Sequence, residues 1–332
     1  MLLNESALAA IAPLLSGAQP AKTTLHTSGG VRVIDCGVQA PGGADAGLLM
    51  AQAAMAGRGT VTLEPAGHFG DAWPDCPWPV VAVSTAEPVA ACLAAQYAGW
   101  KVSDDGYFAM ASGPVRAAIG REDLFDEIGF REQPPVAVGL LETSSLPPEQ
   151  VCRQLARDAG VPPEQLVLLV ARTASPAGTL QVIARSLETA LHKLHDLRFD
   201  LGRIRRGEGR APLAPVPRKD LVAIGRTNDA ILYGGHVVLE VTGDDTSLLA
   251  IGPQAVSQAS PDYGAPFMDL FERAGRDFYA LDPALFAPAM LDMVNVDTGR
   301  RHRFGSLAPT IVGTSFSSPA EQAAGKAAGA GA

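Results

Sequence analysis

The sequence predicts an α/β fold because short apolar runs alternate with helical patterns along the first half of the chain. The apolar runs with strand character are 31–38, 60–63, 79–84, 136–143 and 166–171. Helical patterns separate them at 44–57, 86–98, 113–129 and 148–160. The chain has 332 residues, 47% of them hydrophobic and 18% charged, which excludes a disordered protein and suffices for two domains or one large one.

The composition changes between residues 201 and 217, where four arginines interspersed with Gly are followed by Pro. This stretch is either a basic loop that contacts phosphate or a solvated connector between two lobes, and we favour the connector. Beyond it the pattern becomes more β-like at 230–233 and 236–241, with a helix around 266–274. We therefore predict a first α/β lobe over 1–205, a connector over 206–217, a second lobe over 218–317 and a disordered Ala/Gly-rich tail over 318–332. Whether the two lobes interleave in the sequence is left open.

Charge and hydropathy exclude several partners. The chain carries 26 basic and 35 acidic side chains, a net charge of −9, so it lacks the cationic excess that nucleic acids and acidic membranes attract. No apolar run approaches the ~18–20 residues of a membrane span, and the N-terminus lacks the basic region of a signal peptide. The four cysteines are far apart, as in a reduced protein. We expect a soluble cytoplasmic protein.

The common cofactor motifs are missing from the sequence. There is no Walker loop, no G-x-G-x-x-G between a strand and a helix, no H-E-x-x-H and no G-x-S-x-G. His192 and His195 could share a metal, but Asp196 is the only obvious third ligand nearby, so we predict no metal site. An enzyme with this sequence would use side-chain acid–base chemistry and no tightly bound cofactor.

The segment 181–196 predicts an amphipathic helix. An apolar stripe is formed by Ile183, Leu187, Ala190, Leu191 and Leu194. The opposite face carries Arg185, Glu188, His192 and Asp196. Because Arg185 and Glu188 are three residues apart, their side chains can meet. They form either an exposed salt bridge of little energetic value or one wall of a cleft, where the carboxylate handles protons or stabilises a cation.

Several blocks of sequence resemble one enzyme family. They include A-G-T-L-Q-V-I-A-R-S-L-E at 177–188 and G-R-T-N-D-A-I-L-Y-G-G at 225–235, together with matching stretches at 90–100, 112–114, 264–267 and 277–279. The blocks run from about residue 30 to about residue 310. They are similar to methenyltetrahydromethanopterin cyclohydrolases, and Gln96-Tyr97-Ala-Gly-Trp100 is similar to their bacterial, formaldehyde-oxidising branch.

The resemblance implies reversible hydrolysis of N5,N10-methenyltetrahydromethanopterin to the N5-formyl compound, a step of one-carbon metabolism. It also implies two α/β lobes around a deep pterin-binding cleft rather than a Rossmann fold, homo-oligomers that are commonly trimers, and no metal or redox cofactor. The family's Arg-x-x-Glu pair matches Arg185 and Glu188. Glu188 would take the proton from the attacking water, and Arg185 would orient and tune it.

Other residues are candidates for binding the pterin. Asn228 and Asp229 offer an amide and a carboxylate to a pterin edge. Ser112 and Gly113 either let the backbone approach the ligand or form a plain turn. Tyr97 either stacks on a ring or belongs to the core. The alternatives are a non-catalytic pterin-binding or scaffold protein and another pterin-linked one-carbon enzyme.

Overall fold

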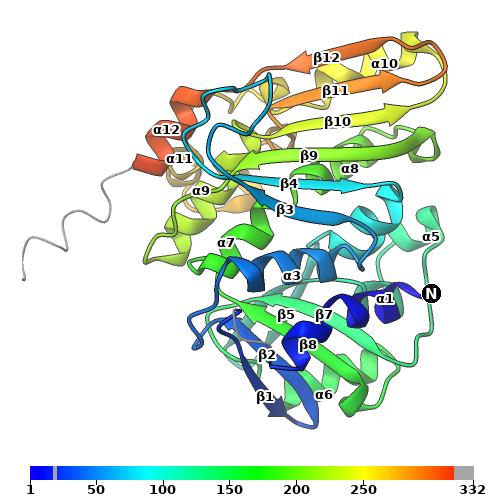
Figure 1. Cartoon of the computed structure of the whole chain (residues 1–332), viewed down its shortest axis with the longest axis vertical. Coiled ribbons are helices and arrows are strands. Elements are labelled where there is room, and N and C mark those ends of the chain that lie inside the picture. The colour runs from blue at the N-terminus through cyan, green and yellow to red at the C-terminus, as the bar shows by residue number, and fades with distance from the viewer. Residues whose placement is uncertain (18–20, 318–332) are drawn as a thin grey trace, which may run out of the picture.

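The computed structural model describes residues 1–17 and 21–317, and it contains two six-stranded sheets with helices between and around them (Figure 1). The predicted tail at 318–332 lies outside the described residues. The structure confirms the α/β class and contains two mixed sheets, each combining parallel and antiparallel pairs. We call them the first and second sheet, drawn at the bottom and at the top of Figure 1.

The first sheet has the strand order β1-β2-β8-β7-β6-β5. Its strands are β1 (Thr24–Ser28), β2 (Val31–Gly37), β5 (Trp100–Asp104), β6 (Tyr107–Ser112), β7 (Ala137–Glu142) and β8 (Leu166–Ala171). The three inner strands β2, β8 and β7 are parallel, and the other pairs are antiparallel. Both faces of the parallel part are covered by helices, which explains why β8 is buried along its whole length.

The second sheet has the order β12-β11-β10-β9-β4-β3. Its strands are β3 (Thr60–Glu64), β4 (Val80–Thr85), β9 (Ile204–Pro212), β10 (His236–Val241), β11 (Met290–Asn295) and β12 (Arg301–Gly305). Only β10 and β11 run parallel to each other.

The two lobes are interleaved in the sequence. Strands β3 and β4 precede residue 205 but belong to the second sheet, so the chain passes from the first sheet to the second, back to the first and again to the second. The predicted boundary between 1–205 and 218–317 therefore does not separate the sheets. The physical reason is that β4 needs β9 as its hydrogen-bonding neighbour.

The predicted connector at 206–217 is wrong over its first half, because Ile204–Pro212 is the inner strand β9. Gly207 and Gly209 alternate here with charged residues, which is the period of a strand with one face against a helix. A Cβ atom on Gly207 would lie 2.7 Å from Leu187 Cδ1, and one on Gly209 would lie 2.6 Å from Ser186 Oγ. The glycines thus let α8 (Ser186–Asp196) approach the sheet closely.

The remaining helices surround the sheets. They are α1 (Leu3–Ala10), α2 (Ala12–Leu15), α3 (Ala44–Ala54), α4 (Val115–Ile119), α5 (Leu124–Ile128), α6 (Glu149–Asp158), α7 (Pro176–Ile183), α9 (Asp220–Leu232), α10 (Asp245–Ile251), α11 (Phe267–Arg273), α12 (Pro309–Ser317) and the π-helix η1 (Val89–Gln96). Short 3₁₀ turns are η2 (Pro163–Gln165), η3 (Leu201–Arg203), η4 (Gly252–Gln254), η5 (Ser257–Ala259), η6 (Phe278–Ala280) and η7 (Pro283–Leu285). Residues 230–232, which the sequence suggested as β-like, end α9 instead.

The helices that follow β7 and β8 lie on opposite faces of the first sheet. Val151 and Leu155 of α6 pack with Leu141 on one face. Ala177 of α7 packs with Leu140 and Leu169 on the other. Helices α3 and α7 thus lie between the two sheets (Figure 1). None of the helices in the described part of the chain is long and apolar enough to cross a membrane.

Candidate active site

The predicted helix over 181–196 is two helices joined at Ala184 and Arg185. Helix α7 ends at Ile183, and α8 begins at Ser186 with Arg185 as its N-cap residue. Glu188 therefore lies in the first turn of α8, where the unpaired backbone N–H groups favour a negative charge. The predicted apolar stripe is confirmed, because Ile183, Leu187, Ala190, Leu191 and Leu194 are all inaccessible to solvent.

Burial decides between the two interpretations of the polar face. Arg185 is only 8% exposed and Glu188 only 6%. An exposed salt bridge is therefore excluded, and both ionisable groups are enclosed by protein. Burial of a charged group is costly unless other groups stabilise it, so the surroundings of this pair matter.

The Arg185 guanidinium donates hydrogen bonds to three groups, which belong to η1, β6 and the preceding helix α7. Its Nη1 donates to the backbone carbonyl of Gln96 at the end of η1. Its Nη2 donates to Ser112 Oγ at 2.9 Å and to Gln181 Oε1 at 3.5 Å. The Gln96 side chain in turn donates to the carbonyl of Ala184 at 3.1 Å. These bonds fix the guanidinium between the π-helix, β6 and the α7–α8 junction.

The predicted contact between Arg185 and Glu188 is not formed as an ion pair in the structure. Among residues 1–17 and 21–317, the carboxylate of Glu188 has no hydrogen-bond or ion-pair partner. Burial raises the pKa of Glu188 above its ordinary value, while the charges of Arg185, His192 and Arg116 lower it and only partly offset the rise. A carboxyl group with a raised pKa is a stronger base once it is ionised.

Tyr97 lies beside the pair, between a histidine and an arginine. Its ring stacks on His192 with centroids 4.4 Å apart and planes 20° apart. The guanidinium of Arg116 lies 4.9 Å from the ring centroid on a cation–π contact. Burial is the main cause that raises the pKa of the phenol to about 12, so Tyr97 stays protonated near neutral pH.

Ser112 ends β6 beside Arg185, and Gly113 follows it. Ser112 is buried and accepts the bond from Arg185. Gly113 has a φ of +94°, and a Cβ atom there would lie 2.9 Å from Leu140 Cδ1. Its N–H donates to the carbonyl of Ala95 at 2.9 Å. Gly113 is thus required by the turn that brings β6 against the π-helix.

Comparison with known proteins identifies the family. A family model described as Cyclohydrolase (MCH) matches residues 2–316. The chain belongs to this family. It is 45% identical over 297 residues to the methenyltetrahydromethanopterin cyclohydrolase of Methylobacterium organophilum, covering 88% of this chain and 90% of that protein.

Two further relatives carry the same name. The protein of Methylobacillus flagellatus is 42% identical over 287 residues, covering 86% of each chain. The protein of the archaeon Methanosarcina barkeri is 36% identical over 318 residues, covering 95% of this chain and 98% of that protein. The chain is thus more similar to these two bacterial proteins than to the Methanosarcina protein, which agrees with its resemblance to the bacterial branch of the family.

Two predicted binding residues of this family member form hydrogen bonds within α9 and to the start of α11. Asn228 donates from its side chain to the carbonyl of Ile224 at 2.8 Å within α9. Asp229 is inaccessible to solvent, and its Oδ1 accepts from the N–H of Phe267 at 2.8 Å, at the start of α11. Burial raises the pKa of Asp229 to about 7. In the structure Asp229 binds the start of α11, and its role toward a pterin stays a prediction.

Sequence reasoning missed Gln96 and Arg116 as parts of the site. Gln96 belongs to the block 90–100 that carried the family resemblance, and Arg116 follows Ser112-Gly113-Pro114 by two residues. Arg116 is 2% exposed and bonds to the carbonyl of Leu93 at 2.9 Å and to Glu122. A lone arginine after a turn carries no local signal of burial, so only the packing of α4 against η1 reveals it.

Five surface cavities of about 180 to 500 Å³ are lined by residues other than Arg185 and Glu188. The deep cleft expected at this pair therefore stays a prediction. Within the residues that the structure describes, no group of three His, Cys, Asp or Glu side chains is arranged to hold a metal ion.

Proposed function

We propose that this chain catalyses the reversible hydrolysis of N5,N10-methenyltetrahydromethanopterin to N5-formyltetrahydromethanopterin. The observation that carries the proposal is the buried Arg185–Glu188 pair at a helix N-terminus, in a chain that aligns with cyclohydrolases along nearly its whole length. A buried carboxylate without a hydrogen-bond partner among the described residues is suited to take a proton from water.

The reaction needs a base and a proton donor, and one carboxyl group can serve as both. The methenyl carbon is electrophilic because positive charge is spread over N5 and N10. Water adds to this carbon while Glu188 takes its proton, which neutralises the cation. The proton then passes to N10, the C–N10 bond breaks with its electron pair on nitrogen, and the remaining hydroxyl proton is released to solvent as the formyl C=O forms on N5.

Arg185 acts on this step through electrostatics and position. Its charge lowers the pKa of Glu188 and so keeps part of the carboxyl ionised despite its burial. Its own bonds to Gln96 and Ser112 hold the guanidinium in one place, where it can orient a water molecule next to Glu188. The contacts of its ring with His192 and Arg116 fix Tyr97 beside this pair.

We further propose that the protein requires no tightly bound cofactor, works in the cytoplasm and assembles as a homotrimer. The proposed chemistry is complete with a carboxyl group and water, and the trimer follows from the family resemblance. Light scattering of the purified protein tests the trimer, which would have three times the chain mass of 34.4 kDa.

The decisive experiment follows the amidinium absorbance of methenyltetrahydromethanopterin on mixing with purified protein. The wild type should remove this absorbance rapidly. Glu188→Gln keeps the shape of the side chain but cannot accept a proton, so kcat should fall by about 10²–10⁴-fold with substrate binding retained. Glu149→Gln, at an exposed position of α6, is the matched control and should behave as wild type.

Two outcomes would count against the proposal. Turnover of Glu188→Gln at the wild-type rate would remove Glu188 from the mechanism. Binding of the substrate by the wild type without any turnover would instead indicate the non-catalytic pterin-binding alternative.

A further inference from the structure

The first sheet contains a point where ligands of α/β proteins commonly bind. Strands β7 and β8 are parallel neighbours, but α6 follows β7 on one face and α7 follows β8 on the other. The two connections leave the carboxyl ends of these strands in opposite directions. Such a switch point in the strand order is where open α/β sheets bind their ligands.

Two polar side chains meet at this switch point. Glu142 is the last residue of β7 and is half-buried. Thr173 lies two residues after the end of β8, and its hydroxyl donates to Glu142 Oε1. Among residues 1–17 and 21–317, Glu142 forms no ion pair. Among these residues, Glu142 Oε2 therefore has no hydrogen-bond donor, and no cationic side chain pairs with the carboxylate.

Glu142 lies on the same side of the sheet as the Arg185–Glu188 pair. Ser112, which accepts the bond from Arg185, is opposite Leu140 in the β6–β7 ladder. Since side chains two residues apart on a strand share a face, Glu142 lies on the face of Leu140, between the two sheets. Burial is the main cause that lowers the pKa of Arg185, and the charges of Glu188 and Glu142 both oppose this lowering. Both carboxylates thus lie within electrostatic reach of the same guanidinium.

The proposed substrate has a group that matches such a carboxylate. A pterin is a 2-amino-4-oxo ring, whose 2-amino group and N3–H point in nearly the same direction. Two parallel N–H donors form a bidentate pair with a carboxylate, which is geometrically selective as well as strong. No positively charged side chain would be required for this contact.

We propose that Glu142 binds the 2-amino and N3–H edge of the pterin at the β7–β8 switch point, while Glu188 acts at the methenyl carbon. This inference rests on the proposed function and adds to it the residue that recognises the pterin ring. Thr173 is a positioning residue, because its hydroxyl holds Glu142 in place. The bond between pterin and Glu142 is made equally in substrate and transition state, so it should govern KM more than kcat.

The first test is steady-state kinetics with methenyltetrahydromethanopterin. Glu142→Gln replaces one acceptor by a donor, so KM should rise by about 10- to 100-fold while kcat changes less than about threefold. Thr173→Val should raise KM by a smaller factor. Glu149→Gln, a carboxylate far from the switch point, is the control for charge removal, and thermal unfolding checks that each variant is folded.

The second test exchanges donors and acceptors on the ligand. Dimethylpterin carries an amino group at position 2, whereas dimethyllumazine carries an oxo group there and a hydrogen on the neighbouring N1. Both can be measured as competitive inhibitors. The wild type should prefer the pterin. Glu142→Gln should prefer the lumazine, because its amide can donate to the 2-oxo group and accept from N3–H.

The outcomes separate this inference from the proposed function. If the wild type does not hydrolyse the substrate, the proposed function fails. If the wild type is active and Glu142→Gln keeps both the wild-type KM and the preference for the pterin, Glu142 does not recognise the ring. A higher KM without a change of inhibitor preference would likewise overturn the bidentate contact, because a merely structural role would produce that result.

Discussion

Glu188 shows how the surroundings of one residue set its chemistry. Burial opposes its ionised form, whereas the start of α8 and the charges of Arg185, His192 and Arg116 favour it. The balance leaves the pKa of Glu188 above its ordinary value. A carboxyl group in this state can exchange a proton with water closer to neutral pH than an exposed glutamate can.

Replacing Arg185 by glutamine should change the pH dependence of the reaction. The positive charge of Arg185 lowers the pKa of Glu188, so its removal raises that pKa further. Because Glu188, the proposed base, can accept a proton only when it is ionised, the rising acid limb of kcat/KM against pH should move to higher pH. We also expect a loss of about 10²-fold at neutral pH, since the guanidinium no longer positions water.

A pH profile of Arg185→Gln measured beside that of the wild type tests this electrostatic role. An acid limb that stays in place, or that moves to lower pH, would show that Arg185 does not set the pKa of Glu188. Arg153→Gln is a suitable control, because this exposed arginine of α6 pairs only with Glu149 among the described residues.

At the scale of elements, glycines in β9 decide how closely α8, which carries the proposed base, approaches the second sheet. A Cβ atom at Gly209 would lie 2.6 Å from Ser186 Oγ and 2.9 Å from the backbone nitrogen of Leu187. These atoms belong to the first turn of α8, directly after Arg185. The position of the Arg185–Glu188 pair thus depends on a glycine of strand β9, where any side chain would collide with α8.

Gly209→Ala should therefore weaken both folding and activity. We expect a loss of about 1–3 kcal/mol in the free energy of unfolding, because the added methyl group overpacks this contact. The displaced α8 should also lower kcat. Urea unfolding and steady-state kinetics measure the two effects. Gly313→Ala is the matched control: its nearest neighbour would be Trp78 at 4.0 Å, and an alanine within α12 should be neutral or stabilising.

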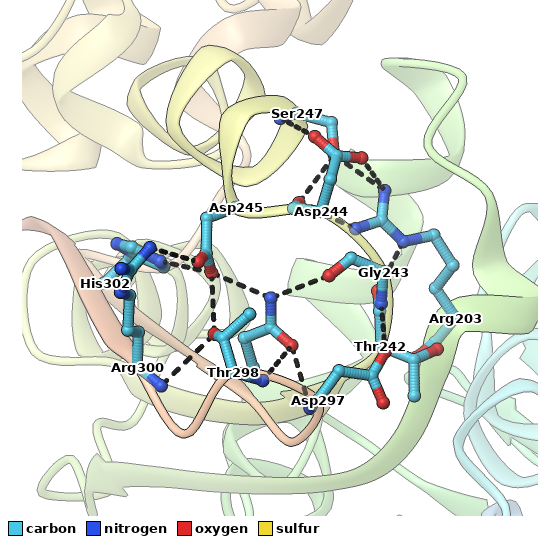
Figure 2. Close-up of polar contacts among 11 residues, drawn as sticks. Arg203, Thr242, Gly243, Asp244, Asp245, Ser247, Asp297, Thr298, Arg300 and His302 are labelled. Carbon is cyan, nitrogen blue, oxygen red and sulfur yellow. Dashed lines mark hydrogen bonds and ion pairs between the residues drawn. The ribbon is translucent and has the colours of Figure 1, made fainter.

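A second element-scale device joins α10 to the hairpin of β11 and β12 (Figure 2). The carboxylate of Asp245, at the start of α10, accepts four hydrogen bonds. Its donors are Asn295 Nδ2 at 2.7 Å, Thr298 Oγ1 at 3.1 Å, Arg300 Nη1 at 2.9 Å and His302 Nε2 at 2.9 Å. The bond from His302 is the largest of the effects that hold the pKa of Asp245 well below its ordinary value.

Asp245→Asn should make this part of the fold less stable in a pH-dependent way. Because folding lowers the pKa of Asp245, its contribution is present above the ordinary pKa of 3.8 and is lost as the pH falls below that value. The variant should melt a few degrees below the wild type at pH 7, and the difference should shrink at pH 3. Thermal unfolding at the two pH values measures this.

An equal difference in melting temperature at both pH values would indicate a loss of packing rather than of a charged network. Glu240→Gln provides the comparison, because this carboxylate lies at an exposed position of the neighbouring strand β10.

At the scale of the whole molecule, neither sheet can form from a continuous piece of chain. Strands β3 and β4 of the second sheet come before the last four strands of the first sheet. The proposed site uses this arrangement, since η1 and β6 reach Arg185 from the segment that precedes β7, while α8 packs on β9. The same passages of the chain from one sheet to the other thus interleave the sheets and assemble the proposed site.

A fragment ending at residue 205 should therefore not fold cooperatively. It would contain β4 without its neighbour β9, leaving an apolar sheet edge unpaired. Circular dichroism and thermal unfolding of fragment 1–205 should show no sharp transition. Co-expression with fragment 206–332 should restore the folded protein and its activity. A cooperative transition in the isolated fragment would mean that the first sheet folds without the second.

Much of the fold and site could be predicted from local patterns in the sequence. Apolar runs located five strands, and helical periodicity placed Arg185 and Glu188 opposite an apolar stripe. These features depend on residues only a few positions apart. The hairpin of β5 and β6 was missed although Asp105 and Gly106 form its turn with positive φ, because its strands mix exposed polar and small residues.

Tertiary structure alone decided which distant groups surround those residues. The bonds from Arg185 to Gln96 and Ser112 span 89 and 73 positions, and β9 became an inner strand although its composition is that of a loop. Asp229, chosen for its chemistry, turned out to hold the start of α11. Periodicity determines which side of a helix or strand is buried. Which segment covers that side depends on packing between parts of the chain that lie far apart in the sequence, and no local pattern indicates which parts will meet. The same packing determines which charges surround Glu188.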